Sequence, residues 1–296
     1  MVWLSILLGI LFVVLGPVLG CLIAGADRIV TARMQRRQGP PLLQPYYDLR
    51  KLLEKDMRAN DVVQLILLVM ALVATVVGGV SFFAGASFLL CIFLETLASL
   101  LYIVAASIGS SPFVQVGVQR EILQVMCYEP MELLTAIGIY LHTGSYASGS
   151  LGAASVPMVM WLPLIFLGLL FVLTIKLRKS PFDVASSHHA HQEIIAGATT
   201  EMSGLTLAVI EVTHWYETVI VLGWVGMFFI TSNPLSILLA LLAVAIVYLL
   251  EIWVDNTFAR VKWQVMLKGA WIVALVAGFV NFSPFFFVGT NGLLFF

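Results

Sequence analysis

Several acidic side chains lie inside stretches of the sequence that are otherwise apolar. Glu95 occupies the middle of FLLCIFLETLASLLYIVAA, with no other formal charge nearby in the sequence. Glu129 and Glu132, in QVMCYEPMELL, are three residues apart and therefore share one face of a helix. An acidic residue within a membrane-spanning segment is costly, so a functional role is the first hypothesis for it. We expect these carboxyls to hold or pass protons, with structural hydrogen bonding between helices as the alternative for Glu95 alone.

A second polar stripe follows in VIEVTHWYETV. Glu211, His214 and Glu217 stand at successive i, i+3 positions and lie along one side of a helix. Carboxyls and imidazoles joined by water form a ladder that moves protons through a helical bundle. The spacing of these acids and histidines matches neither H-E-x-x-H nor a duplicated Glu-x-x-His set, so a metal site is not expected here.

The densest polar stretch is the segment SPFDVASSHHAHQEIIAGATTEMSG. It contains Asp183, Glu193 and Glu201, together with the histidines at positions 188, 189 and 191. A proton-relay or conformational role is one interpretation, and a solvated loop is the other. A metal cluster is less well supported, because adjacent histidines on a loop or helix point in different directions.

The elements that position these residues follow from composition. The 296 residues are 61% hydrophobic and only 10% charged, whereas a soluble domain carries about a quarter charged residues. We therefore predict an all-α integral membrane protein, one bundle of about eight transmembrane helices that forms a single domain. The predicted spans are 2–24, 62–83, 88–109, 122–143, 156–177, 205–230, 235–254 and 267–288.

The basic residues predict which side each connection faces. All 15 Lys and Arg residues fall in four alternate connections, and eight of them stand between Arg28 and Arg58. Because positive residues favour the cytoplasmic side, these four polar loops are predicted to be cytoplasmic and both termini to lie outside. The longest of them are the loop 25–61, predicted to dock a partner, and the polar coupling loop 178–204.

Within the first loop, PLLQPYYDLRKLLEKD predicts an amphipathic helix. Leucines and Tyr46 recur at helical spacing with charged residues between them, and Pro45 suits a first turn. Elsewhere, the three cysteines are single and lie in apolar stretches without any C-x-x-C. Iron–sulfur, zinc and disulfide frameworks find no support in that pattern.

Together these segments resemble a known family. Asp27-Arg28, Ala32, Gln35, Arg37, Gly39-Pro40, Leu43-Gln44-Pro45, Asp48, Lys51-Leu52 and Lys55-Asp56 resemble the first cytoplasmic loop of the H-type membrane subunit of complex I. Tyr128-Glu129 is similar to that family's S-Y-E, with Cys127 in place of Ser. The run from Pro181-Phe182-Asp183 to Thr200-Glu201-Met202-Ser203-Gly204 is similar to its P-F-D…T-E-Y-S-G.

Two departures favour one branch of the family. Quinone-reducing members carry an insertion like N-R-V-G-P-x-G between the G-P and the L-L-Q-P, whereas here only Pro41-Leu42 follow Pro40. The segment SSHHAHQE (186–193) also replaces the acidic P-E-A-E-x-E run of complex I. Both features resemble the membrane-anchor subunit of energy-converting group 4 [NiFe] hydrogenases of the Ech and Mbh types, and their sulfur-reducing relatives.

The resemblance implies a non-catalytic subunit of a prokaryotic cell membrane that couples ferredoxin-linked hydrogen chemistry to proton or sodium translocation. Its implied partners are the hydrogenase large and small iron–sulfur subunits, a ferredoxin-like electron-transfer subunit, an antiporter-like membrane subunit and the lipid bilayer, with no nucleic acid. The [NiFe] centre and [4Fe-4S] clusters are expected in those partners, and no cofactor or metal in this chain.

It also implies two groups of site residues. The docking and coupling residues are Arg28, Arg33, Gln35, Arg37, Gly39, Pro40, Gln44, Asp48 and Lys51. The proton or ion path consists of Glu95, Glu129, Glu132, Asp183, Glu193, Glu201, Glu211 and His214.

Four alternatives stay open. Within the family, the chain resembles a quinone-binding H-type subunit of complex I or the membrane subunit of a sulfane reductase. Outside it, a carboxylate-lined ion transporter is less favoured, because Pro130 has no second helix break at a corresponding position. A purely structural membrane anchor is the fourth alternative.

Overall fold

A computed structural model describes residues 2–56, 62–185 and 196–289. Over these residues the chain is helical, without a β-strand longer than the isolated bridge between Ser87 and Ala147. The α-helices are α1 (Val2–Met34), α2 (Gln44–Leu53), α3 (Val62–Phe83), α4 (Phe88–Ser107), α5 (Pro112–Thr143), α6 (Met158–Trp161), α7 (Pro163–Lys176), α8 (Leu205–Met227), α9 (Ser236–Thr257) and α10 (Trp263–Gly289). Short 3-10 helices cover Ser148–Ala153 and Gly197–Thr199.

Seven helices in the described part of the chain are long and apolar enough to cross a membrane: α1, α3, α4, α5, α8, α9 and α10. Large apolar side chains cover their outer surfaces, and Leu241 of α9 and Leu275 of α10 are 62% and 65% exposed. Side chains of this kind suit contact with lipid rather than water. The protein is therefore an all-α integral membrane protein.

The apolar stretch 156–177 is not one continuous helix. It divides into α6 and α7 at Leu162, whose backbone φ of −127° and ψ of 53° are not helical. Pro163 follows, and a proline disfavours helical geometry in the residue before it. The 14 residues of α7 span about 21 Å at 1.5 Å per residue, which is less than a bilayer's hydrocarbon core.

Two helices run beyond the stretches that hydropathy marked. α1 continues from the apolar stretch 2–24 to Met34, so the connection to α2 begins later than residue 25. α5 begins at Pro112, ten residues before the apolar stretch 122–143, and continues through Pro130. Polar residues in the added parts of both helices, such as Asp27 and Glu121, are accommodated because the turn after α7 supplies them with charged partners.

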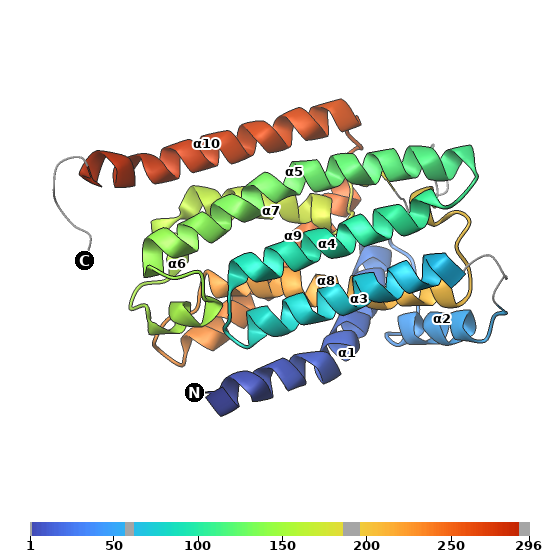
Figure 1. The fold of residues 1–296 in the computed structure, drawn as a ribbon, viewed down its shortest axis with the longest axis horizontal. Helices are drawn as coiled ribbons and strands as arrows, with labels where there is room; N and C mark the ends of the chain where they lie inside the picture. Colours follow the sequence, from blue (N-terminus) through green and yellow to red (C-terminus); the bar gives the residue numbers. More distant parts are fainter. Residues whose placement is uncertain (1, 57–61, 186–195, 290–296) are drawn as a thin grey trace.

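The connections gather at two ends of the bundle (Figure 1). At one end, which we call the polar end, the segments 35–56, 108–111, 177–185, 196–204 and 258–262 meet. Glu201 bonds the backbone at Ser110 there, and the amide of Val261 donates to the carbonyl of Pro181 at 3.0 Å. The opposite end is formed by 84–87, 144–157 and 228–236, where the amide of Ser232 donates to the carbonyl of Ala154. Which end faces the cytoplasm stays a prediction.

The expected amphipathic helix is present as α2, with Pro45 in its first turn. It lies at the polar end against α1 and α8 (Figure 1). The core between the long helices is apolar and aromatic, and its largest fully buried side chains include Trp224, Phe88 and Phe228. Against this background the buried charges are conspicuous.

Candidate functional site

Three cations at the end of α7 point into the protein. Lys176 is the last residue of α7, and Arg178 and Lys179 follow in a turn where Arg178 has a φ of 54°. Their side chains are 8%, 21% and 8% exposed. By sequence they were expected among the charges of a polar loop. Lys and Arg are almost never this buried unless they are paired, and each of these has a carboxylate partner.

Lys176 is held between a carboxylate and two aromatic rings. Its Nζ donates to Oε1 of Glu132 on α5 at 2.7 Å, and Glu132 is only 1% exposed. The same ammonium lies 4.8 Å from the ring centre of Tyr128 and 4.5 Å from that of Trp224. Both distances are within the range of a cation–π interaction. α5, α7 and α8 therefore meet around one positive charge.

Arg178 makes a corresponding set of contacts nearer the polar end. Its Nε lies 3.5 Å from Oε1 of Glu121 on α5, and its Nη1 contacts Nε2 of His214 on α8. The guanidinium also lies 5.3 Å from the ring centre of Tyr102 on α4. The predicted stripe on α8 is thus connected to the interior through His214.

A small polar cavity separates these two cations. Its lining includes the side chains of Lys176, Arg178, Glu121, Glu217 and Tyr128, and its volume of about 20 Å³ is room for about one water molecule. The Tyr128 hydroxyl donates to Oγ of Ser99 at 3.1 Å on the wall of the same cavity. A water here would connect groups from α4, α5, α7 and α8 by hydrogen bonds.

Glu95 completes the group from α4. It is 1% exposed, and neither carboxyl oxygen has a hydrogen-bond partner within the described residues. Its charged neighbours are Lys176, Glu217 and Glu132. We call the set of Glu95, Glu121, Glu132, Glu217, Lys176 and Arg178 the interior site.

The interior site has more carboxyls than cations. Four carboxyls share it with two permanent positive charges, so full ionisation would leave two uncompensated negative charges in the bundle. Burying unpaired charge is expensive, and groups in that position take up protons instead. The site can therefore hold and exchange protons without bond chemistry.

Lys179 anchors a second cluster between α1 and α9. Its Nζ donates to Oδ2 of Asp27 at 2.8 Å, and the Tyr248 hydroxyl donates to the same oxygen at 3.2 Å. Asp255 of α9 accepts a hydrogen bond from the backbone amide of Ser180 at 2.8 Å. The turn after α7 is thereby fixed on two sides.

The two acids of the 178–204 segment that the structure describes lie at the polar end. Asp183 pairs with Arg260 at 2.7 Å. This ion pair joins the connection that precedes α8 to the connection that follows α9. Glu201 accepts hydrogen bonds from the backbone amides of Ser110 and Ser111 at 2.9 and 3.0 Å, where α5 begins. Glu201 therefore fixes the turn that leads into α5. Glu193 and the histidines at 188, 189 and 191 lie outside the described residues.

The remaining path residues flank the interior site. Glu129 is half-buried on α5 and acts electrostatically on Glu132. Glu211 is half-buried on α8, with Tyr102 as an electrostatic neighbour. Glu95, Glu132 and His214 are thus brought to one place, and Glu129 and Glu211 lie beside it.

The predicted docking residues form two contacts at the polar end. Arg28 of α1 pairs with Asp48 of α2 at 2.7 Å, and the Gln44 amide donates to the same carboxyl at 2.8 Å. Further along, Arg37 donates to Gln35, which donates to the side chain of Asn256 on α9 at 3.1 Å.

Partial burial raises the pKa of Asp48, but the hydrogen bonds from Arg28 and Gln44 and the charges of Arg28 and Lys51 outweigh it, so this pKa lies below its usual value. Arg33 and Lys51 are exposed and Pro40 is half-buried. Gly39 allows close approach to α1, because a Cβ there would lie 2.9 Å from Cα of Ile29.

The path expected from the sequence lacked Lys176, Arg178 and Glu121, whereas Glu217 was already part of the polar stripe expected with Glu211 and His214. Lys176 and Arg178 follow a strongly apolar helix, and hydropathy places such residues outside the membrane. A usable signal was present in the tyrosines at 102 and 128, which, with Glu132, offer partners to a cation from inside predicted spans. Among the described residues, no group of three or more His, Cys, Asp or Glu side chains is arranged to hold a metal ion.

Comparison with known proteins agrees with this architecture. The family model described as NADH dehydrogenase matches residues 6–285. Hydrogenase-4 component C of Escherichia coli K12 is 29% identical, over 85% of this chain and 87% of that protein. The H-type subunit of the NADH-quinone oxidoreductase of Anoxybacillus flavithermus is also 29% identical, over 95% of this chain and 92% of that protein.

A solved structure shares the fold. It is a chain in the structure of the membrane-bound sulfane sulfur reductase, an archaeal respiratory membrane complex. The TM-score is 0.80 at 22% identity, over 94% of this chain and 99% of the other. With the match of the family model over nearly its whole length, the chain belongs to the NADH dehydrogenase subunit 1 family of integral membrane proteins.

Proposed function

We propose that this chain is the membrane-anchor and coupling subunit of a multisubunit, energy-converting [NiFe] hydrogenase. It docks a peripheral hydrogenase module and links ferredoxin-dependent hydrogen evolution or uptake to the translocation of protons or sodium ions. The [NiFe] centre and [4Fe-4S] clusters belong to partner subunits. The complex lies in a prokaryotic cell membrane, with the polar end of this chain on the cytoplasmic side.

The observation that carries the coupling role is the charge balance of the interior site. Four carboxyls lie among two buried cations inside a membrane bundle, and both oxygens of Glu95 are without a hydrogen-bond partner in the described residues. Such a group changes its proton content when a nearby charge changes. A redox event in a module at the polar end supplies that change, and the site relays it across the bundle.

The path begins where His214 contacts Arg178 and continues to the pair of Lys176 and Glu132. Glu211, Glu129 and Glu95 extend it to either side toward neighbouring antiporter-like subunits. Asp183 and Glu201 hold the connections at the polar end in place. The docking face consists of Arg33, Gln35 and Arg37, and the bridge between Arg28 and Asp48 holds α2 beside it.

The hydrogenase assignment is supported by the similarity to hydrogenase-4 component C and by the short Gly39-Pro40-Pro41 turn. A quinone-binding H-type subunit is the second candidate, because several similar relatives are named as that subunit of an NADH-quinone oxidoreductase. The sulfane reductase is the third, through its fold.

The test is to purify the complex through a tag on this chain and to measure its metals and activities. The proposal expects nickel in the complex and hydrogen evolution from reduced ferredoxin. Reduction of polysulfide without nickel would assign the chain to a sulfane reductase, and reduction of a quinone analogue would assign it to complex I. Either result would overturn the hydrogenase proposal.

A further inference from the structure

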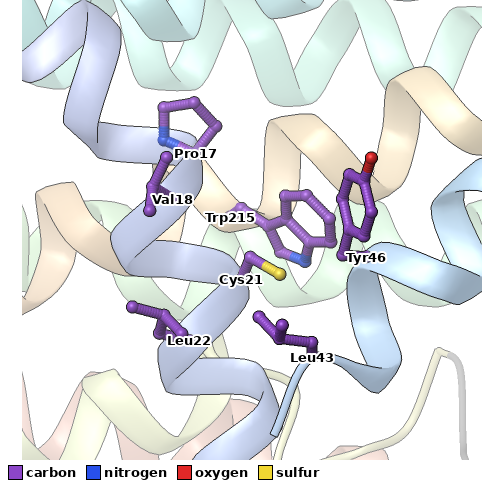
Figure 2. A pocket seen from close by; sticks show the side chains of 7 residues that line it. All are labelled: Pro17, Val18, Cys21, Leu22, Leu43, Tyr46 and Trp215. Carbon is purple, nitrogen blue, oxygen red and sulfur yellow. The ribbon is translucent and has the colours of Figure 1, made fainter.

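A groove lies between α1, α2 and α8, away from the interior site (Figure 2). Val18, Cys21 and Leu22 of α1 form one wall, and Leu43 and Tyr46 form the facing one. Trp215 of α8 lies at the back between them (Figure 2). The volume is about 240 Å³, and the exposed lining is entirely apolar. For comparison, an apolar protein cavity of about 150 Å³ binds benzene.

Two glycines of α1 set the limits of this groove. A Cβ at Gly20 would lie 2.4 Å from the carbonyl oxygen of Trp215, so α1 and α8 touch there. A Cβ at Gly25 would lie 1.9 Å from the carbonyl oxygen of Leu42, so the segment before α2 touches α1 there. Pro17, which also lines the groove, interrupts the hydrogen bonding of α1. The helix is therefore clamped at two points, and its groove-lining residues run from Pro17, before the first contact, to Leu22, before the second.

The groove opens onto the surface that faces lipid. Val14 and Val18 of α1 are 61% and 52% exposed, and they continue the apolar surface of a helix long enough to span the membrane. Leu43 and Tyr46 are half exposed on the other side of the opening. Tyrosines of this kind lie at the membrane–water interface, as amphipathic helices such as α2 do. The medium at the opening is therefore the acyl chains of a membrane leaflet.

Positive charge lies above the groove at the polar end. Arg28 is about 1.7 turns beyond Leu22 on α1 and bridges to Asp48 of α2, with Lys51 as a further charged neighbour. One negative and two positive charges leave an excess of one cation. Arg33 in the last turn of α1 and the arginines of the turn that follows are also exposed. Clusters of this kind next to a membrane span attract anionic lipids.

We propose that the groove holds one acyl chain of an anionic phospholipid, whose head group binds at Arg28 and Lys51. The lipid fills the gap between α1 and α2 and holds α2 at the membrane surface. The occupant is distinct from the ions of the proposed path, and the proposal does not depend on the proposed function.

Trp215 makes the proposal measurable, because bromine on an acyl chain quenches tryptophan emission on contact. Trp215 is only 7% exposed, so lipid reaches it through the groove. The full chain, with the subunits that co-purify, is placed in vesicles containing brominated phosphatidylglycerol or brominated phosphatidylcholine at equal mole fraction. The emission of Trp215 is obtained by subtracting the emission spectrum of Trp215→Phe from that of the wild type.

We expect brominated phosphatidylglycerol to remove most of the Trp215 emission and brominated phosphatidylcholine to remove little of it. Val18→Phe, which fills the groove from an exposed position, should restore the emission, and Lys51→Gln should abolish the preference for phosphatidylglycerol. Trp271, which is 43% exposed on α10, is the matched control, since both lipids should quench it equally in all variants.

Three results would overturn the proposal. Absence of quenching by either lipid would mean that the groove is empty or covered by a partner subunit. Equal quenching by both lipids would rule out recognition of an anionic head group. Recovery of one isoprenoid quinone per complex by solvent extraction, together with unquenched Trp215, would assign the groove to that ligand instead.

Discussion

Nζ of Lys176 and Oε1 of Glu132 are 2.7 Å apart in the middle of the bundle, and their side chains are 8% and 1% exposed. The two residues come from α7 and α5 and are 44 positions apart in the sequence. A charge pair this deep is expensive to desolvate, so it is weak evidence for stability. It is better explained as an electrostatic connection, through which a change of charge on α5 alters the energy of the charged groups on α7.

Removing one member of this pair should destabilise the protein strongly. Lys176→Met leaves the Glu132 carboxylate buried without its cation, and loss of one partner of a buried ion pair costs about 3–5 kcal/mol. Lys176→Met combined with Glu132→Gln should recover most of that loss, because residue 132 is then neutral and no longer needs a cation. Thermal unfolding of the four proteins in detergent measures the cycle. Additive losses in the double variant would show that the two side chains do not interact.

Glu201 should act through the structure of α5. Glu201→Ala removes the acceptor for the amides of Ser110 and Ser111 just before α5, and an amide left without its acceptor costs about 1–3 kcal/mol. Glu201→Gln keeps one acceptor oxygen and should lose less stability, and it should retain ion pumping. Stability in detergent and pumping in vesicles are compared for both variants. Full stability with abolished pumping in Glu201→Gln would place this carboxyl in the path after all.

The contact of α1 with α8 should depend on the absence of a side chain at Gly20. In Gly20→Ala the new methyl would meet the carbonyl oxygen of Trp215, and overpacking of this kind costs about 1–3 kcal/mol. Gly152→Ala is the matched control, because nothing lies within 4 Å of its new methyl. Melting temperatures of the two variants give the comparison. Equal stability would mean that the helices are not in contact at Gly20.

The attachment of α2 to α1 should weaken in acid. The pKa of Asp48 is lowered in the folded protein, so its contribution to stability is present above its unfolded pKa of 3.8 and is lost as the pH falls through the lower folded value. The distance between spin labels on Val14→Cys and Tyr47→Cys should increase over this range below pH 3.8. Asp48→Asn should remove that pH dependence, and an unchanged transition in Asp48→Asn would assign it to another group.

Much of the fold follows from local pattern. Long apolar runs predict the helices that span the membrane, and the alternation of apolar and charged residues predicts α2. The break at Leu162 was less visible, because the run 156–177 is apolar throughout and only Pro163 marks it. The extensions of α1 and α5 were missed because polar residues end an apolar run without ending a helix.

The acids of the candidate site were recognisable because a carboxyl is conspicuous in an apolar segment. Their partners were not, since Lys176 lies 44 residues from Glu132 and Arg178 lies 36 residues from His214. A cation just beyond an apolar run has the same local sequence whether it faces water or turns into the bundle. Only the packing of α7 against α5 and α8 distinguishes these two cases.

Ion pumping by Glu95→Gln tests the central claim most directly. The substituted amide keeps the shape of the side chain but has no exchangeable acid proton, so inside-out vesicles of the complex should lose most redox-driven ion uptake. The redox activity of the peripheral module should be retained. Glu54→Gln, which changes an exposed carboxyl at the end of α2, should pump like the wild type. Unchanged pumping in Glu95→Gln would contradict the proposal that the interior site couples redox chemistry to ion transport.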